Sequence, residues 1–280
     1  MNKLLVFQSD FGLEDAAVSS MEGVAYGVSK DLNIRHLTHN IPQFNIFDAS
    51  YRLFQTINYW PSDTVFVSIV DPGVGSDRKS IVAKTGNGMY VVTPDNGTIT
   101  HIKEFVGISE VRLIDESINR LKDSEQSYTF HGRDVYAYTG ARLASGTISF
   151  EQVGPLFDVN ELCTLELYGC KEIENGIRGQ VDIYDIRFGS LWTSISIDEF
   201  KKCGFNFGDE VLLEIYNKGS KVYSNRVVYG RSFADVEINA PIIYMNSANH
   251  MAVAINQGSF KDSFNIGVGS DWKIEMKKAK

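Results

Sequence analysis

The apolar run Val65-Phe66-Val67-Ser68-Ile69-Val70 leads directly into Asp71-Pro72-Gly73-Val74-Gly75-Ser76-Asp77-Arg78. The run is short, β-branched and aromatic, which predicts a buried strand, and the Pro-Gly pair ends it. Asp71 is therefore expected at the carboxyl end of a parallel strand, where open α/β sheets collect their ligands. Asp-Pro-Gly is also an ordinary turn, so this segment taken alone slightly favours a structural role.

Two further predicted strands end in the same way. Leu4-Leu5-Val6-Phe7 runs into Ser9-Asp10-Phe11-Gly12, and Met89-Tyr90-Val91-Val92 runs into Thr93-Pro94-Asp95-Asn96-Gly97. A fourth polar cluster, Thr129-Phe130-His131-Gly132-Arg133-Asp134, precedes a helical pattern. Three strand-end aspartates, together with the imidazole and the guanidinium of the fourth cluster, predict convergence on a single pocket.

Strands and helices alternate in the first half of the chain. Apolar residues recur at helical spacing from Glu14 to Val28, from Phe47 to Tyr59 and from Asp134 to Ser145, with Gly146 at the end of the last helix. This order is typical of a mainly parallel sheet with helices on both faces.

The second half of the chain has a different pattern. Beyond about Gly154 the helical periodicity nearly disappears, and short apolar or alternating stretches are separated by Gly or Asn. This pattern predicts a small antiparallel sandwich or barrel. The expected organisation is an α/β domain over residues 1–155, a linker over 156–176 and an all-β domain over 177–280.

Composition excludes several classes of protein. The 280 residues carry a net charge of −8, which argues against a nucleic-acid partner held by phosphate contacts. The three cysteines form no Cys-x-x-Cys pair, so neither a disulfide framework nor a zinc site is expected. No stretch approaches the roughly 20 apolar residues that cross a bilayer, and we expect a cytoplasmic protein. The terminal Lys277-Lys278-Ala279-Lys280 is expected to be a frayed tail.

The polar motifs, taken in order, resemble those of the S-adenosylmethionine hydrolases (S-adenosylmethionine hydroxide adenosyltransferases), which are related to fluorinases and chlorinases. The second half adds the matches Asp185-Ile186-Arg187-Phe188-Gly189 with Trp192-Thr193, Ser232-Phe233-Ala234-Asp235, and Asn246-Ser247. Each motif alone is weak, but the ordered set spans nearly the whole chain. The resemblance implies an α/β domain followed by a smaller β-barrel domain. It also implies a homotrimer with each site between the N-terminal domain of one subunit and the C-terminal domain of the next.

The resemblance further implies attack of water or hydroxide on the ribose 5′-carbon of S-adenosyl-L-methionine, without a metal or cofactor. Asp71, Arg78 and His131 would form a catalytic triad around the attacking water, in which Asp71 accepts a proton or hydrogen bond and His131 could share that work. The implied substrate contacts are Asp10 at the ribose hydroxyls, Phe233 on adenine, Phe44 near the methionine or ribose side, Asp185 and Phe188 at the methionine part, and Ser190, Asn246 and Ser247.

The chain departs from the family pattern at the methionine end. Relatives usually have Asn where this chain has Ser190, and often Thr-Asn-Ile where it has Thr193-Ser194-Ile195. A hydroxyl has fewer hydrogen-bonding groups than a carboxamide, so recognition of the methionine carboxylate is expected to be weaker, rearranged or water-mediated. The remaining histidines are expected to be structural: His36, His39, His101 and His250.

Three alternative functions stay open. A halogenase is disfavoured, because an ionised Asp71 would repel a halide ion by about 4 kcal/mol at contact distance with an effective dielectric near 20. A metal-dependent phosphoester hydrolase would bind two ions through acidic and imidazole groups, namely Asp10, Asp71, Asp95, His131 and Asp134. A protein that binds adenosine or S-adenosylmethionine without turnover is the third alternative, and the departure at Ser190 is the reason to retain it.

Overall fold

The structure is a computed structural model that describes residues 3–126 and 128–279. The chain divides into two compact units, with the boundary between Leu165 and Glu166. This boundary lies within the segment 156–176 that the sequence assigns to a linker. The N-terminal unit is α/β and the C-terminal unit is dominated by strands, so the predicted fold class is confirmed. Helices in the described part of the chain all lack the length and hydrophobicity of a membrane-spanning segment.

The described residues of the N-terminal unit form a seven-stranded sheet with the order β2-β1-β3-β5-β4-β6-β7. Its strands are β1 (Leu4–Ser9), β2 (Asn33–Thr38), β3 (Val65–Ile69), β4 (Ser80–Thr85), β5 (Tyr90–Pro94), β6 (Ile108–Leu113) and β7 (Leu156–Phe157). Neighbouring strands among β2, β1, β3 and β5 are parallel, whereas β4, β6 and β7 pair antiparallel. The sheet is therefore mixed, and Asp10, Asp71 and Asp95 follow strands of its parallel half.

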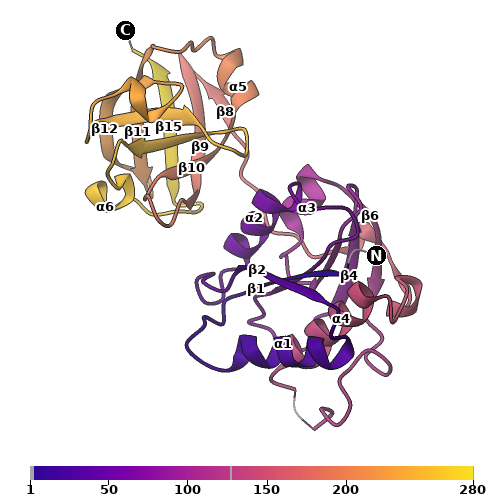
Figure 1. The fold of residues 1–280 in the computed structure, drawn as a ribbon. Helices are drawn as coiled ribbons and strands as arrows, with labels where there is room; N and C mark the ends of the chain where they lie inside the picture. The colour runs from indigo at the N-terminus through magenta and orange to yellow at the C-terminus, as the bar shows by residue number, and fades with distance from the viewer. Residues whose placement is uncertain (1–2, 127, 280) are drawn as a thin grey trace. The chain divides into compact units, whose positions relative to one another are not determined.

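Helices cover both faces of this sheet. They are α1 (Ala17–Val28), α2 (Ile46–Ile57), α3 (Thr100–Phe105) and α4 (Tyr138–Ser145). Figure 1 shows α1 and α4 on one side of the sheet and α2 and α3 on the other. A π-helical turn over Gly132–Ala137 leads into α4, and 3-10 turns follow at Glu151–Val153 and Val159–Glu161. The predicted helix end at Gly146 is confirmed, because this residue has a φ of +77°.

Side-chain alternation along the strands produces two apolar layers. In β1, Leu5 and Phe7 pack with α1 and α4, whereas Val6 packs with residues of α2 and α3. Both faces are buried, which explains why these strands read as continuous apolar runs. Gly140 allows α4 to lie directly on the sheet, since a Cβ there would come within 2.4 Å of the side chain of Val67.

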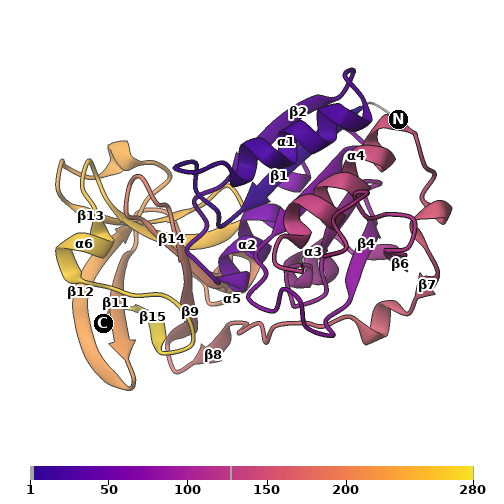
Figure 2. The same ribbon diagram turned by 90° about the horizontal axis from the view of Figure 1, so that it is seen from below.

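The C-terminal unit is a closed barrel. In the described residues its ring has the order β10-β14-β13-β12-β11-β15-β9, and β9 pairs again with β10, while β8 adds to β9 outside the ring. The strands are β8 (Lys171–Ile173), β9 (Gly176–Tyr184), β10 (Leu191–Ser196), β11 (Glu210–Asn217), β12 (Ser220–Tyr229), β13 (Pro241–Met245), β14 (His250–Ile255) and β15 (Trp272–Lys278). The pairing of β12 with β13 is parallel. Figure 2 shows the same strands from below.

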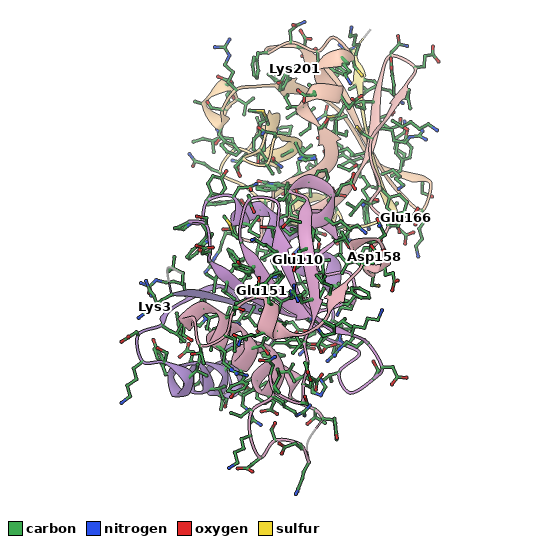
Figure 3. The ribbon with its side chains drawn as sticks, turned by 90° about the vertical axis from the view of Figure 1, so that its right-hand side faces the viewer. Lys3, Glu110, Glu151, Asp158, Glu166 and Lys201 are labelled. Atoms are coloured by element: carbon green, nitrogen blue, oxygen red, sulfur yellow. The ribbon has the colours of Figure 1, made fainter. Side chains whose placement is uncertain are left out.

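Short helices and an ordered terminus complete the barrel. Helices α5 (Ile197–Lys202) and α6 (Phe260–Phe264) and a 3-10 turn over Phe233–Asp235 lie between strands, and Figure 3 labels the exposed Lys201 on α5. The predicted frayed tail is wrong for Lys277, which lies in β15 and hydrogen-bonds Glu214 at 2.8 Å. The last residue of that predicted tail, Lys280, lies outside the described residues.

Candidate active site

Asp71 and Arg78 form a tight ion pair just beyond the end of β3. Arg78 Nε lies 2.8 and 2.9 Å from the two carboxylate oxygens of Asp71, and Nη2 lies 2.5 Å from Oδ2. Only 6% of the Asp71 side chain and 10% of the Arg78 side chain are exposed. A two-pronged contact of this kind fixes the position of the carboxylate as well as its electrostatic partner.

Tight turns bring the two residues together. The chain turns immediately after Asp71, whose carbonyl accepts a hydrogen bond from the backbone N–H of Val74 at 3.2 Å. Gly75 has a φ of +80°, and a Cβ there would lie 3.2 Å from the carbonyl oxygen of Tyr128. Glycine therefore suits this position on both conformational and steric grounds, and the loop returns Arg78 to the carboxylate.

The same guanidinium reaches His131. Arg78 Nη2 lies 3.0 Å from His131 Nδ1. Because a guanidinium only donates hydrogen bonds, Nδ1 is the acceptor and a neutral His131 carries its proton on Nε2. That Nε2 is buried, and no group among the described residues accepts a hydrogen bond from it. The three residues predicted as a triad thus form one cluster. Its last member, His131, carries an N–H donor on Nε2 that has no acceptor among the described residues.

Burial and neighbouring charges shift the pKa values of this cluster. Burial lowers the pKa of His131; Glu116 opposes this effect and Arg78 adds to it. Burial also works against the charge on Arg78, but the hydrogen bonds and charge of Asp71 outweigh it, so the pKa of Arg78 is raised. At neutral pH the cluster therefore contains a charged guanidinium beside a neutral imidazole.

Arg78 also contacts two residues that were not predicted from the sequence, Ser80 and Tyr136. Its Nη1 donates to Ser80 Oγ at 3.1 Å, and its guanidinium carbon lies 5.5 Å from the centre of the Tyr136 ring. The Ser80 and Tyr136 hydroxyls are 3.2 Å apart. Burial raises the pKa of Tyr136, so it remains a neutral phenol. Ser80 begins β4 and Tyr136 lies in the π-helical turn, and no local motif marks either residue.

Asp10 and Phe44, both predicted substrate contacts, meet beyond the end of β1. Asp10 Oδ2 accepts the backbone N–H of Phe44 at 2.9 Å. Phe44 has a φ of +65°, an uncommon conformation for an aromatic residue, and its side chain is 67% exposed. The adjacent Phe11 contacts the His131 motif, since a Cβ on Gly132 would lie 3.1 Å from the Phe11 ring.

The other acidic residues of these motifs make structural contacts. Asp95 Oδ1 accepts the backbone N–H of Cys163 at 2.9 Å, and Asp134 pairs with Arg133 at 2.7 Å. Asn96, next to Asp95, donates to the carbonyl of Val70 at 2.8 Å and so supports the end of β3. Within the described residues, no group of three or more His, Cys, Asp or Glu side chains is placed to hold a metal ion.

The barrel carries an open pocket of about 640 Å³. Four of the predicted substrate contacts line it, namely Asp185, Phe188, Ser190 and Phe233. Several other lining residues were not predicted from the sequence, namely Arg187, Tyr244, Ile255, Asn256, Gln257, Gly258 and Ser259. Five of these seven residues lie outside the named strands, where sequence periodicity gives no signal of a shared pocket.

Aromatic rings dominate one side of this pocket. The rings of Phe233 and Tyr244 lie 5.1 Å apart at 52°. Burial raises the pKa of Tyr244, and hydrogen bonds with the side chains of Ser190 and Trp192 oppose this shift. Ser190 is only 2% exposed, and its hydrogen bond with Tyr244 helps to hold that side chain in place.

A tight turn shapes another side of the pocket. Asp185 Oδ1 accepts the backbone N–H groups of Arg187 at 3.2 Å and Phe188 at 3.4 Å. This turn leaves the Phe188 ring 70% exposed at the rim. The carboxylate of Asp185 is thus oriented by its own loop.

Asn246 and Ser247 lie on the hairpin between β13 and β14, outside the set of lining residues. Asn246 Oδ1 accepts the backbone N–H groups of Ala248 at 2.9 Å and His250 at 3.0 Å. The buried Asn246 side chain therefore shapes this hairpin.

Comparison with known families agrees with both halves of the molecule. Residues 5–154 match the model of the SAM hydroxide adenosyltransferase N-terminal domain, and residues 179–273 match that of the C-terminal domain. The chain belongs to the SAM hydroxide adenosyltransferase family. The family predicted from the ordered motifs is therefore confirmed.

Individual relatives of this family cover most of the chain. The (R)-S-adenosyl-L-methionine hydrolase of Methanocaldococcus jannaschii is 32% identical over 90% of this chain and 88% of its own length. That of Thermus thermophilus is 31% identical over 94% and 96%. A fluorinase from Actinopolyspora mzabensis is 23% identical over 97% and 96%. The crystal structure of an uncharacterized conserved protein from Thermotoga maritima superimposes with a TM-score of 0.88 at 30% identity, covering 98% of this chain and 100% of that one.

Proposed function

We propose that this protein is an S-adenosyl-L-methionine hydrolase that forms adenosine and L-methionine. The observation that carries the proposal is the cluster of Asp71, Arg78 and His131, in which a carboxylate and a buried N–H donor are joined through one guanidinium. The proposal is also supported by the sequence identity of 31–32% between this chain and two (R)-S-adenosyl-L-methionine hydrolases.

The proposed reaction is a displacement at the ribose 5′-carbon. The water oxygen forms a bond to this carbon, the carbon–sulfur bond breaks, and its electron pair stays on sulfur. Methionine leaves as a neutral thioether, so no group has to protonate it. The remaining task is to hold the water in line, and good orientation lowers a barrier by on the order of 7–11 kcal/mol.

The cluster can orient such a water through two hydrogen bonds, one that the water donates and one that it accepts. Arg78 occupies Oδ2 of Asp71 with two donors, but Oδ1 accepts only from Nε and keeps a lone pair that can accept from the water. His131 Nε2–H can donate to the water oxygen, which makes His131 a donor in this scheme. The proton released by the water passes to Asp71 and from there to solvent. Asp71 also disfavours a halide nucleophile, since like charges repel.

Substrate recognition in this proposal divides among the remaining site residues. Asp10 offers two acceptor oxygens to the ribose hydroxyls beside Phe44. In the barrel pocket, Phe233 stacks on adenine with Tyr244 beside it. The remaining assignments are Asp185, Phe188 and Ser190 at the methionine part, with Asn246 and Ser247 on the neighbouring hairpin.

Assembly and location complete the proposal. The resemblance implies a homotrimer, and the odd number of cysteines without a Cys-x-x-Cys pair fits a reducing, cytoplasmic setting. Light scattering of the purified protein checks the assembly, with a mass of about three times 31.3 kDa expected. A monomer at assay concentration would contradict it.

Incubation with S-adenosyl-L-methionine in oxygen-18 water tests the reaction. We expect one labelled oxygen in the 5′-hydroxyl of adenosine, an equal amount of methionine, and full activity in excess EDTA. Binding without methionine release would overturn the proposal in favour of a binding protein. Loss of activity in EDTA that returns with a divalent cation would point to metal-dependent hydrolysis. Formation of 5′-chloro-5′-deoxyadenosine in chloride would identify a halogenase.

A further inference from the structure

A chain of hydrogen bonds ends beside Asp10 and involves two histidines expected to be structural. Ser9 Oγ lies 2.7 Å from His39 Nδ1, and His39 Nε2 lies 2.8 Å from His36 Nδ1. His36 Nε2 lies 2.9 Å from Glu22 Oε1. These hydrogen bonds connect the end of β1, the end of β2 and α1. They run from the fully buried Ser9 to the Glu22 side chain, which is 35% exposed.

The carboxylate at the outer end sets the direction of these hydrogen bonds. Glu22 only accepts, so His36 donates from Nε2. When His36 is neutral, its Nδ1 accepts from His39 Nε2–H, and His39 Nδ1 then accepts from the hydroxyl of Ser9. Burial, and the nearby His36, lower the pKa of His39 to about 4. His39 is therefore a neutral ring at neutral pH, and one tautomer satisfies both of its neighbours.

The inner end of the chain holds the backbone on both sides of Asp10. Ser9 Oγ accepts the backbone N–H of Phe11 at 3.2 Å. The carbonyl of His39 accepts the backbone N–H of Gly12 at 2.8 Å. Ser9 and His39 thus fix the residues before and after Asp10, while the Asp10 carboxylate itself is steered by the N–H of Phe44 at 2.9 Å.

We propose that His39 is a positioning residue for Asp10, acting through Ser9 and supported by His36 and Glu22. The inference rests on the proposed function, in which Asp10 receives the ribose hydroxyls. A carboxylate that binds two hydroxyls at once has to be held within about 0.5 Å of its productive position. The hydrogen-bonded chain supplies that precision without contacting the substrate.

The test compares two ligands that differ only in the hydroxyls Asp10 is proposed to bind. Dissociation constants for adenosine and 2′,3′-dideoxyadenosine are measured by calorimetry for the unmodified protein and for Ser9→Ala, His39→Leu and Glu22→Gln. We expect Ser9→Ala and His39→Leu to weaken adenosine binding by roughly fivefold to tenfold, the effect of one lost hydrogen bond. Binding of the dideoxy analogue is expected to stay unchanged. Glu22→Gln, at a partly exposed position, is expected to act in the same direction with a smaller effect.

Two conservative variants serve as matched controls. Ser9→Thr keeps the hydroxyl, and His39→Asn keeps an acceptor where Nδ1 lies, so both are expected to restore adenosine binding to near the original value. In assays with S-adenosyl-L-methionine, the loss is expected in KM rather than in kcat. Thermal unfolding of every variant is measured in parallel.

Each outcome decides a separate question. Equal losses for both nucleosides, or no loss in Ser9→Ala and Glu22→Gln, would overturn the positioning role even if His39→Leu fails to fold. Equal affinity of the unmodified protein for both nucleosides, with no effect of Asp10→Asn, would instead overturn the assignment of Asp10 to the ribose. Because these dissociation constants are measured without turnover, they test the positioning role of His39 even if the protein does not hydrolyse S-adenosyl-L-methionine.

Discussion

Asp71 in the N-terminal unit and Asp182 in the C-terminal unit are both buried carboxylates, but their surroundings differ. Asp71 receives two-pronged hydrogen bonds from the permanent cation of Arg78. Asp182 receives a hydrogen bond from the neutral Gln180 at 2.8 Å, and burial raises its pKa to about 7 despite Gln180 and the more distant charge of Lys273. A carboxylate with a fixed cation is suited to orient a nucleophile, whereas one without it costs stability when it ionises.

Asp71→Asn tests the chemical side of this comparison and is expected to have the largest effect. The substitution keeps the shape but removes the negative acceptor, so kcat should fall by about 100-fold to 10,000-fold. KM should stay within about threefold, because the substrate contacts remain. Initial rates of methionine release provide the measurement.

Asp182→Asn is the matched control for Asp71→Asn. It removes the second carboxylate of this comparison, which lies in the barrel, and should leave kcat unchanged. Similar losses of kcat in the two variants would show that the two carboxylates do not differ as described.

Phe233→Ala sharpens the distinction between chemistry and recognition. Loss of a stacked ring should raise the dissociation constant for adenosine by roughly 5-fold to 100-fold, with little change in kcat. Phe207→Ala is the control, since Phe207 is another exposed aromatic residue of the same unit, stacked on Tyr229 at 4.6 Å. Calorimetry that finds equal effects in the two variants would exclude the assignment of Phe233 to adenine.

The smallest effect is expected on stability. Because burial raises the pKa of Asp182 to about 7 from 3.8, the folded state binds more protons than the unfolded state between those values. Stability from this group is therefore lost as pH rises through about 4 to 7 and stays low above it. Asp182→Asn should raise the free energy of unfolding at pH 8 by about 1–4 kcal/mol.

Thermal unfolding at pH 4, 6 and 8 checks this prediction. The melting temperature of Asp182→Asn should exceed that of the unmodified protein by a few degrees at pH 8, with the difference shrinking towards pH 4. A constant difference at all three values would mean that ionisation of Asp182 is not its cause.

The family resemblance implies the triad of Asp71, Arg78 and His131, and the residue patterns alone favour polar side chains near these positions. Each lies in a segment rich in glycine or proline, next to an apolar strand or a helical pattern. Parallel pairing of β1 with β3 then places the ends of those strands at one edge of the sheet. Local composition therefore predicts polar side chains at that edge, but it does not separate Asp71 from Asp95, which bonds the backbone of Cys163 instead.

Features that depend on pairing between distant strands were not predictable in the same way. The antiparallel direction of β4 leaves no mark on its composition, and the contact of Ser9 with His39 depends on how β1 pairs with β2. In the sequence Tyr244 is one more apolar residue of β13, and only the pairing of strands in the closed barrel places it in the pocket.

The error at the C-terminus was avoidable. Ile274 and Met276 alternate with polar residues and are fully buried in β15, a pattern that predicts a strand. The cluster of terminal lysines favours a frayed tail instead, because a cluster of like charges is usually solvated. In the structure, Lys277 instead pairs with Glu214 and Glu275 on the barrel surface.

The contact between Arg78 and His131 also constrains how this site can change. A guanidinium has no lone pair to offer in any orientation, so the imidazole cannot exchange its two nitrogens while Arg78 is present. Replacing Arg78 by a side chain that can accept a hydrogen bond would allow the other tautomer of the ring, in which Nε2 carries no proton and cannot donate. Substitutions at the two positions are therefore expected to have non-additive effects.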